Sequence, residues 1–328
     1  MRRIISIAAC VALAIFAVSC QKDGFSGKEQ TAVFSVVIPD EAQTRAGEPT
    51  FTVSDGSLVD KLYYEVYVGG DLMYEGNVNA TANSNPKAFN VNLNLVKGVE
   101  YEILFWAQCS NCPYYSWESL KAVNVSYAGN ANDETRDAFY GRVPKYTVTD
   151  TPQTVYLTRP FAQVNFGASA TDWETALPFV QTDNGFNLSS KVVMSNIPNC
   201  FNVSTGDIVA NSTTASVVFD FAAAPVTWAD YNSDITYTAT ENGQSVTNTY
   251  KRVAMNYILA SSTGDNIGTV NAYFIHNKNT AATALEKEVL QVPARQNYRT
   301  NILGSIFAGG NQFTVIISPG FENNDYVL

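Results

Sequence analysis

The side chains that could do chemistry are few in this chain. It has 328 residues, of which five are cysteines and one, His276, is a histidine. A serine–histidine–aspartate site would need His276, which ends an apolar stretch and precedes three polar residues, so we expect it at the surface. The sequence has no glycine-rich phosphate loop, His-Glu-x-x-His or Gly-x-Ser-x-Gly motif. Paired carboxylates, as in glycosidases, stay open because spatial pairing cannot be read from one sequence. We predict no enzyme, no cofactor and no metal.

Cys109 and Cys112 form a Cys-x-x-Cys pair, which has three interpretations. A zinc site needs four nitrogen or sulfur ligands, or three and a water, and His276 is the only histidine. A redox loop would open a helix in a strand–helix–strand unit, which the flanking sequence does not indicate. In an oxidising compartment a local disulfide is the simplest interpretation, and it is our prediction.

The N-terminus predicts export. Arg2 and Arg3 precede an apolar stretch at residues 4–18, and the small residues before Cys20 complete a secretory signal over residues 1–19. A cysteine directly after such residues resembles a lipobox, so Cys20 is the predicted site of lipid attachment. Two or more acyl (palmitate-type) chains anchor a protein stably. The alternative is a plain secreted protein in which Cys20 is incidental.

The residues after Cys20 predict where the body resides. The segment 21–23, Gln-Lys-Asp, resembles a short tag that sends lipoproteins to the outer face of the outer membrane. Residues 20–30 are polar and predict a flexible tether. Without residues 1–19 the chain has 18 basic residues (20 − 2) and 30 acidic ones, so nucleic acid is excluded as a partner.

Short stretches of alternating apolar and polar residues dominate the remaining chain. This period of two, punctuated by Gly, Asn and Asp clusters, predicts an all-β protein of sandwich domains. Arg159-Pro160 interrupts the pattern, so we expect an N-terminal domain over residues 31–160 and a C-terminal domain over 161–328. Helical turns are expected at 134–140 and at 171–176, the latter capped by Thr171 with Glu174 at the capping-box position. The expected strands include 34–38, 62–68, 89–95, 99–105, 190–194, 215–221, 252–260, 269–275, 288–292 and 313–317.

Four tryptophans support a second function class, a cell-surface lipoprotein that binds glycans. Exposed aromatic rings stack on sugars, and Trp106, Trp117, Trp173 and Trp228 could supply such a platform. The alternative is that they pack in the core, as large aromatic residues mostly do.

Four segments together resemble the FimA/Mfa-like fimbrillins, the pilin subunits of type V pili. They are residues 155–166 (VYLTRPFAQVNF), 137–141 (DAFYG), 255–260 (MNYILA) and 297–302 (NYRTNI). The resemblance implies two β-sandwich domains of transthyretin-like topology and assembly without catalysis. It also implies fimbrial partner subunits, self or paralogous, a location in the fimbrium if the chain is processed, and a role in adhesion to a host or bacterial surface ligand.

The same resemblance implies cleavage after an arginine by a trypsin-like protease. Arg45, followed by Ala46, stands where that cut would fall, and cleavage would release Cys20 with the first strand. The freed sheet edge could accept a strand from a neighbouring subunit. Phe313, Val315 and Ile317 alternate near the C-terminus and are the predicted donor strand. Two alternatives stay open: this strand closes its own domain, or the chain is an uncleaved accessory, anchor or tip subunit.

Overall fold

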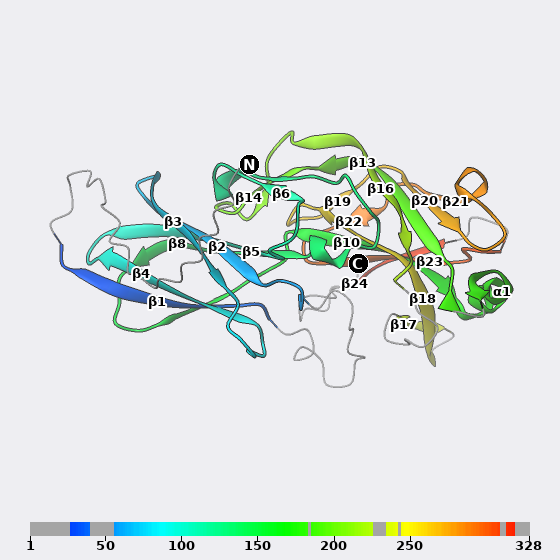
Figure 1. Cartoon of the computed structure of the whole chain (residues 1–328), viewed down its shortest axis with the longest axis horizontal. Coiled ribbons are helices and arrows are strands. Elements are labelled where there is room, and N and C mark those ends of the chain that lie inside the picture. The colour runs from blue at the N-terminus through cyan, green and yellow to red at the C-terminus, as the bar shows by residue number, and fades with distance from the viewer. Residues whose placement is uncertain are drawn as a thin grey trace, which may run out of the picture.

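The computed structural model describes residues 27–39, 56–182, 185–225, 234–241, 244–308 and 313–318. Over these residues the chain is built from β-strands in several sheets, with a single α-helix, α1 (Ala170–Val180). Figure 1 shows two β-rich bodies along the long axis, the blue and cyan N-terminal strands in one and α1 at the far end of the other. The predicted all-β fold with sandwich-like domains is confirmed.

The first sandwich consists of two sheets around one apolar core. One sheet has the order β4-β1-β9 and the other β3-β2-β5-β8. An isolated bridge between Tyr140 and Thr158 connects the two sheets along one side. The bounds are β1 (Glu29–Val37), β2 (Lys61–Val68), β3 (Asp71–Asn79), β4 (Ala88–Val96), β5 (Glu100–Gln108), β8 (Ala138–Thr147) and β9 (Gln153–Tyr156).

Alternation along β4 shows why these residues form a sandwich. Phe89 and Val91 are buried and lie in the first core, as do Leu93 and Leu95, whereas the residues between them are exposed. A strand points successive side chains to opposite faces, so this pattern places one face on the core and the other in solvent.

The second sandwich also pairs two sheets, of order β17-β18-β10-β23-β24 and β16-β13-β20-β21. Helix α1 packs against β10 and β18 at one end. The bounds are β10 (Phe161–Ser169), β13 (Ser189–Pro198), β16 (Thr213–Ala223), β17 (Asp234–Glu241), β18 (Gln244–Leu259), β20 (Val270–Ile275), β21 (Leu285–Val289), β23 (Arg299–Gly304) and β24 (Phe313–Ser318).

Shorter elements complete the described chain. A four-stranded sheet, β15-β14-β7-β6, lies where the two bodies meet (Figure 1), and two small pairs are β11-β12 and β19-β22. Their bounds, with the 3-10 turns, are β6 (Tyr115–Ser116), η2 (Leu120–Ala122), β7 (Val123–Val125), η3 (Glu134–Arg136), β11 (Gln181–Thr182), β12 (Gly185–Phe186), β14 (Cys200–Asn202), β15 (Asp207–Ile208), β19 (Asp265–Asn266), η5 (Ala281–Thr283) and β22 (Pro293–Ala294).

The division between the domains differs from a single cut near residue 160. Leu120, Val123 and Tyr127 precede that point but pack in the second core. The backbone explains the difference, because β7 pairs with β14 of the second half, Cys200 opposite Asn124. Alternation identifies a strand but not the core against which it packs, so the sequence placed this segment in the first domain.

Some predicted boundaries also move. β1 includes Glu29 and Gln30, which were expected in the tether, because they pair with Val96 and Leu95 of β4. Strand β21 ends at Val289 rather than 292.

The helical turns differ as well. Ser169, not Thr171, caps α1, since its hydroxyl accepts a hydrogen bond from the Asp172 N–H at 3.3 Å. The turn expected over 134–140 ends at Arg136, and β8 begins at Ala138.

Candidate assembly site

The first strand, β1, fills the middle of a sheet. Its nine residues pair antiparallel with β4 on one side, and Phe34 to Val37 pair in parallel with β9 on the other. Both backbone edges of β1 are therefore used over its second half. Without β1, the facing edges of β4 and β9 would lose their partners, and unpaired backbone groups away from water are costly.

The inward side chains of β1 fill the first core. Phe34 is completely buried, with its ring centroid 6.0 Å from that of Phe105 and 4.9 Å from that of Tyr146. Val36 is also completely buried, and Ile38, just after the strand, is 3% exposed. β1 is thus a structural plug in an apolar slot formed by β4, β5 and their neighbours.

The predicted processing residues Cys20, Arg45 and Ala46 lie outside the described residues. In the sequence, Arg45 stands eight residues after Val37, the last residue of β1. Lipid attachment and cleavage therefore stay predictions.

The predicted donor residues Phe313, Val315 and Ile317 form β24, the edge strand of the five-stranded sheet. β24 pairs antiparallel with β23 along its whole length. The three side chains are half-buried, and Phe313 meets Phe166 edge-on at 6.4 Å between centroids. In this structure β24 closes its own domain, which was the alternative interpretation, and donation to a neighbour stays a prediction.

The segments 137–141 and 155–166, noted above for their sequence motifs, are joined by a buried ion pair. Arg159 Nε lies 2.7 Å from Asp137 Oδ1, and Arg159 Nη2 donates to Asp137 Oδ2 at 2.8 Å. Both residues are almost completely buried, and the guanidinium lies 4.4 Å from the Phe139 ring centroid. This bidentate geometry fixes the chain just before β8 against the crossing from β9 to β10.

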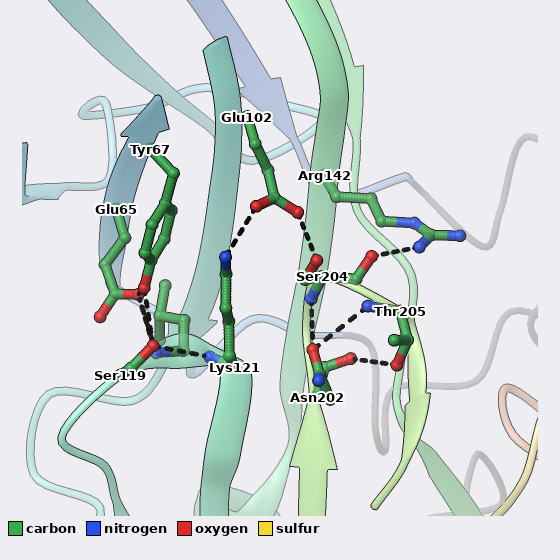
Figure 2. Close-up of polar contacts among 10 residues, drawn as sticks. Glu65, Tyr67, Glu102, Ser119, Lys121, Arg142, Asn202, Ser204 and Thr205 are labelled. Carbon is green, nitrogen blue, oxygen red and sulfur yellow. Dashed lines mark hydrogen bonds and ion pairs between the residues drawn. The ribbon is translucent and has the colours of Figure 1, made fainter. Parts of the chain in front are cut away.

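A polar network joins the first sandwich to the small sheet (Figure 2). Glu102 of β5 accepts the Ser204 hydroxyl and lies 2.9 Å from the Lys121 ammonium, while Arg142 of β8 donates to the Ser204 carbonyl. The Asn202 side-chain oxygen holds this loop by accepting the Ser204 N–H at 2.8 Å. These contacts span the junction between the domains.

A second carboxylate, Glu65 of β2, is buried in the same region. It accepts the Tyr67 hydroxyl at 2.5 Å and the Leu120 N–H at 2.9 Å, so it fixes η2 to the first sandwich. Burial and the hydrogen bond to Glu65 raise the pKa of Tyr67 above its ordinary value. Glu65, Glu102 and Ser204 were not predicted from the sequence, since neither an acidic residue in a strand nor a serine in a turn carries a signal of its distant partner.

The candidate chemical residues are dispersed. His276 stacks on Phe179 at 5.5 Å just after β20, and burial together with Lys278 lowers its pKa. Cys109 and Cys112 are free thiols in this structure, with the Cys112 N–H donating to the Cys109 carbonyl at 3.1 Å. Burial raises the pKa of Cys112 to about 11, and the disulfide stays a prediction. Over the described residues, no cluster of His, Cys, Asp and Glu could hold a metal.

The three tryptophans in the described part of the chain do not form a sugar platform, one of the two alternatives. Trp106 and Trp173 are buried, and Trp117 is half-buried, edge-on to Tyr63 at 5.0 Å between centroids. Trp228 lies outside the described residues. The three described tryptophans thus follow the alternative of core packing. No helix in the described part of the chain is long and apolar enough to span a membrane.

The fold and its plugged sheet define a two-domain, all-β protein with an N-terminal strand inserted in the first core. The chain belongs to a family of unknown function, DUF6562, whose model matches residues 24–327. No curated protein matches it.

Solved structures resemble this chain at low sequence identity. A fimbrial assembly protein from Parabacteroides distasonis is 13% identical, with a TM-score of 0.45, over 89% of this chain and 96% of that one. The fimbrial anchor protein Mfa2 from Porphyromonas gingivalis is 12% identical, with a TM-score of 0.41, over 89% and 97%.

Proposed function

We propose that this chain is a structural or accessory subunit of a surface fimbria that assembles by strand exchange in the slot of β1. The observation that carries the proposal is the position of β1, an N-terminal strand held between β4 and β9 with its largest side chains in the core. A cut between β1 and β2 would let β1 leave without rethreading the rest of the fold.

The proposed route begins with export. Cys20 anchors the chain in the outer membrane at the cell surface, where a trypsin-like protease cuts between Arg45 and Ala46. The released fragment contains Cys20 and β1. The slot then accepts an extended strand from another fimbrial subunit, which pairs with β4 and β9 through its backbone.

The C-terminal strand is chemically suited to replace β1. The segment 34–38 (FSVVI), which covers the end of β1 and the next residue, presents Phe34, Val36 and Ile38 to the core. The segment 313–317 (FTVII) has the same residue types at the same spacing, Phe313, Val315 and Ile317. A second copy of this chain could therefore supply the side chains that β1 withdraws, and we propose self-association as the mode of assembly.

The free energy of burying the apolar side chains of β1 supports a slot that another strand must fill once β1 has left. Burying one large apolar side chain stabilises by about 1.5–3 kcal/mol, so Phe34, Val36 and Ile38 together contribute roughly 5–9 kcal/mol. That is comparable to the whole stability of an ordinary domain, about 5–15 kcal/mol. A subunit that has lost β1 would be unstable until another strand enters.

Limited proteolysis tests this proposal. Protein lacking residues 1–20 is treated with trypsin, and we expect a cut after Arg45 followed by SDS-resistant ladders. Arg45→Ala should abolish both, whereas Lys28→Ala, which removes an exposed lysine just before β1, should leave both unchanged. Resistance at Arg45, or cleavage there with the protein remaining monomeric, would contradict the polymerising function.

The donor strand is tested separately. Phe313→Asp should permit the cut but prevent ladders, because it places a charge in the apolar slot. Thr314→Asp, at an exposed position of the same strand, is the matched control. Equal ladders from both variants would exclude β24 as the donor.

A further inference from the structure

The outer face of the β4-β1-β9 sheet carries a regular set of uncharged polar groups. Asn90, Asn92 and Asn94 alternate along β4 and are exposed. In the next strand, Ser35 lies opposite Asn90, and Thr154 of β9 lies opposite Ser35. Amides and hydroxyls therefore extend across all three strands of this face.

One aromatic ring stands beside these groups. Tyr156, the last residue of β9, is 68% exposed and lies opposite Val37 of β1. Over the odd residues of β1 from 31 to 37, and over their partners in β4 and β9, no residue is charged.

Solubility of an exposed strand does not require three asparagines. Asparagine is depleted in strands, where threonine fits the pleated backbone better. Solvent-facing sheet positions usually carry charged residues, which keep the surface soluble. Three residues of low strand propensity on one face of a strand indicate a functional constraint.

Hydrogen bonds orient the two outer asparagines. The Thr31 hydroxyl donates to Asn94 Oδ1 at 2.8 Å, and Asn90 Nδ2 donates to the Thr81 hydroxyl at 3.2 Å. Asn92 stands between them, about 6.8 Å from each along the strand, which is twice the rise per residue. The face thus presents amides at a repeating distance, the outer two held by hydrogen bonds, an arrangement suited to an extended ligand.

The chemistry of this face selects one class of ligand. Between residues 31 and 37 of β1 this face has no charge to attract nucleic acid, metal ions or an acidic polymer; the nearest charged residue along β1 is Glu29. Its exposed large apolar side chains are Val33 and Tyr156, which are few for the core of a protein interface. An amide group offers two donors and an acceptor, which match neighbouring sugar hydroxyls. A tyrosine ring can stack on the apolar face of a sugar. We propose that this face, with Asn92 and Tyr156 as its main contacts, binds a neutral polysaccharide.

This inference does not depend on strand exchange, and it is tested on the uncleaved protein. Native gel electrophoresis is run through gels that contain a soluble β-glucan, an α-glucan, a mannan or a galactan, with an anionic polysaccharide as the comparison. We expect retardation by at least one neutral polymer and none by the anionic one.

Variants assign the binding to this face. Tyr156→Ala, and separately Asn90, Asn92 and Asn94 all changed to Thr, should weaken binding at least tenfold. The threonine variant should keep the fold, because threonine favours strands. Tyr273→Ala, which alters a tyrosine of β20 in the second sandwich, is the control and should bind as the unaltered protein does.

Three outcomes would overturn the inference. These are no retardation by any neutral polymer, an equal loss in Tyr273→Ala, and a dimer in sedimentation that Tyr156→Ala abolishes. The last outcome would make a second copy of the chain the occupant of this face. None of the three bears on cleavage at Arg45 or on ladder formation.

Discussion

The buried pair of Asp137 and Arg159 gives the sharpest prediction about stability. In Asp137→Asn, the guanidinium of Arg159 remains almost completely buried but loses the counter-charge that lies 2.7 Å away. Breaking one partner of a buried pair costs about 3–5 kcal/mol. For a domain of roughly 150 residues, that corresponds to a decrease in melting temperature of about 6–20 °C.

Thermal unfolding, followed by circular dichroism, measures the effect. The double variant Asp137→Leu with Arg159→Met removes both charges and should recover most of the loss, because the uncompensated charge is the main cost. A decrease below about 1 kcal/mol in Asp137→Asn, or a double variant no better than the single one, would refute the reasoning.

Three further predictions concern β1, the C-terminal strand and pH. Phe34→Ala should destabilise the uncleaved protein by about 3–5 kcal/mol in urea unfolding. Ser35→Ala, on the outer face of the same strand, should cost less than about 0.5 kcal/mol. Similar losses in both variants would contradict the role of β1 in filling the first core. The Asp172 carboxylate accepts the backbone N–H groups of residues 306–308, just before β24. Asp172→Asn should therefore lower the free energy of unfolding by about 2–3 kcal/mol and speed amide exchange in β24 more than in β10. Equal acceleration in both strands would exclude this anchoring role. The pKa of His276 is lowered in the folded protein, so the unfolded chain binds a proton at His276 more readily. The contribution of His276 to stability therefore falls as pH drops through about 6.5. His276→Phe should make the free energy of unfolding depend less on pH between pH 5 and 7, and an unchanged slope would contradict this.

Local sequence pattern predicted most of the longer strands. The alternation around Phe34, Phe89 and Val192 identified half-buried strands because the two faces of a strand meet different solvents. The same rule missed β3, whose residues are mostly exposed on an edge, and β17. β3 has no fully buried residue, so it leaves no periodic signal.

The alternation of apolar and polar residues did not predict which distant residues pair. Phe34 pairs with Gln153, 119 residues away, and Glu65 with the N–H of Leu120. Asp137 was singled out in the sequence as part of a short motif, but its pairing with Arg159 was not predicted. Partners so distant along the chain are selected by backbone pairing and packing, and residue type alone does not specify them.

The sequence by itself determined the prediction of a lipid-anchored, all-β chain, because Cys20 and the strand pattern are local signals. It also identified Arg45 and the alternating residues 313–317. Only the tertiary structure decided that β1 lies inside a sheet, that β24 lies at an edge, and that three asparagines share one face with Tyr156. The physical reason is that order within a sheet comes from non-local backbone hydrogen bonds, whereas periodicity reports only which face of a strand meets water.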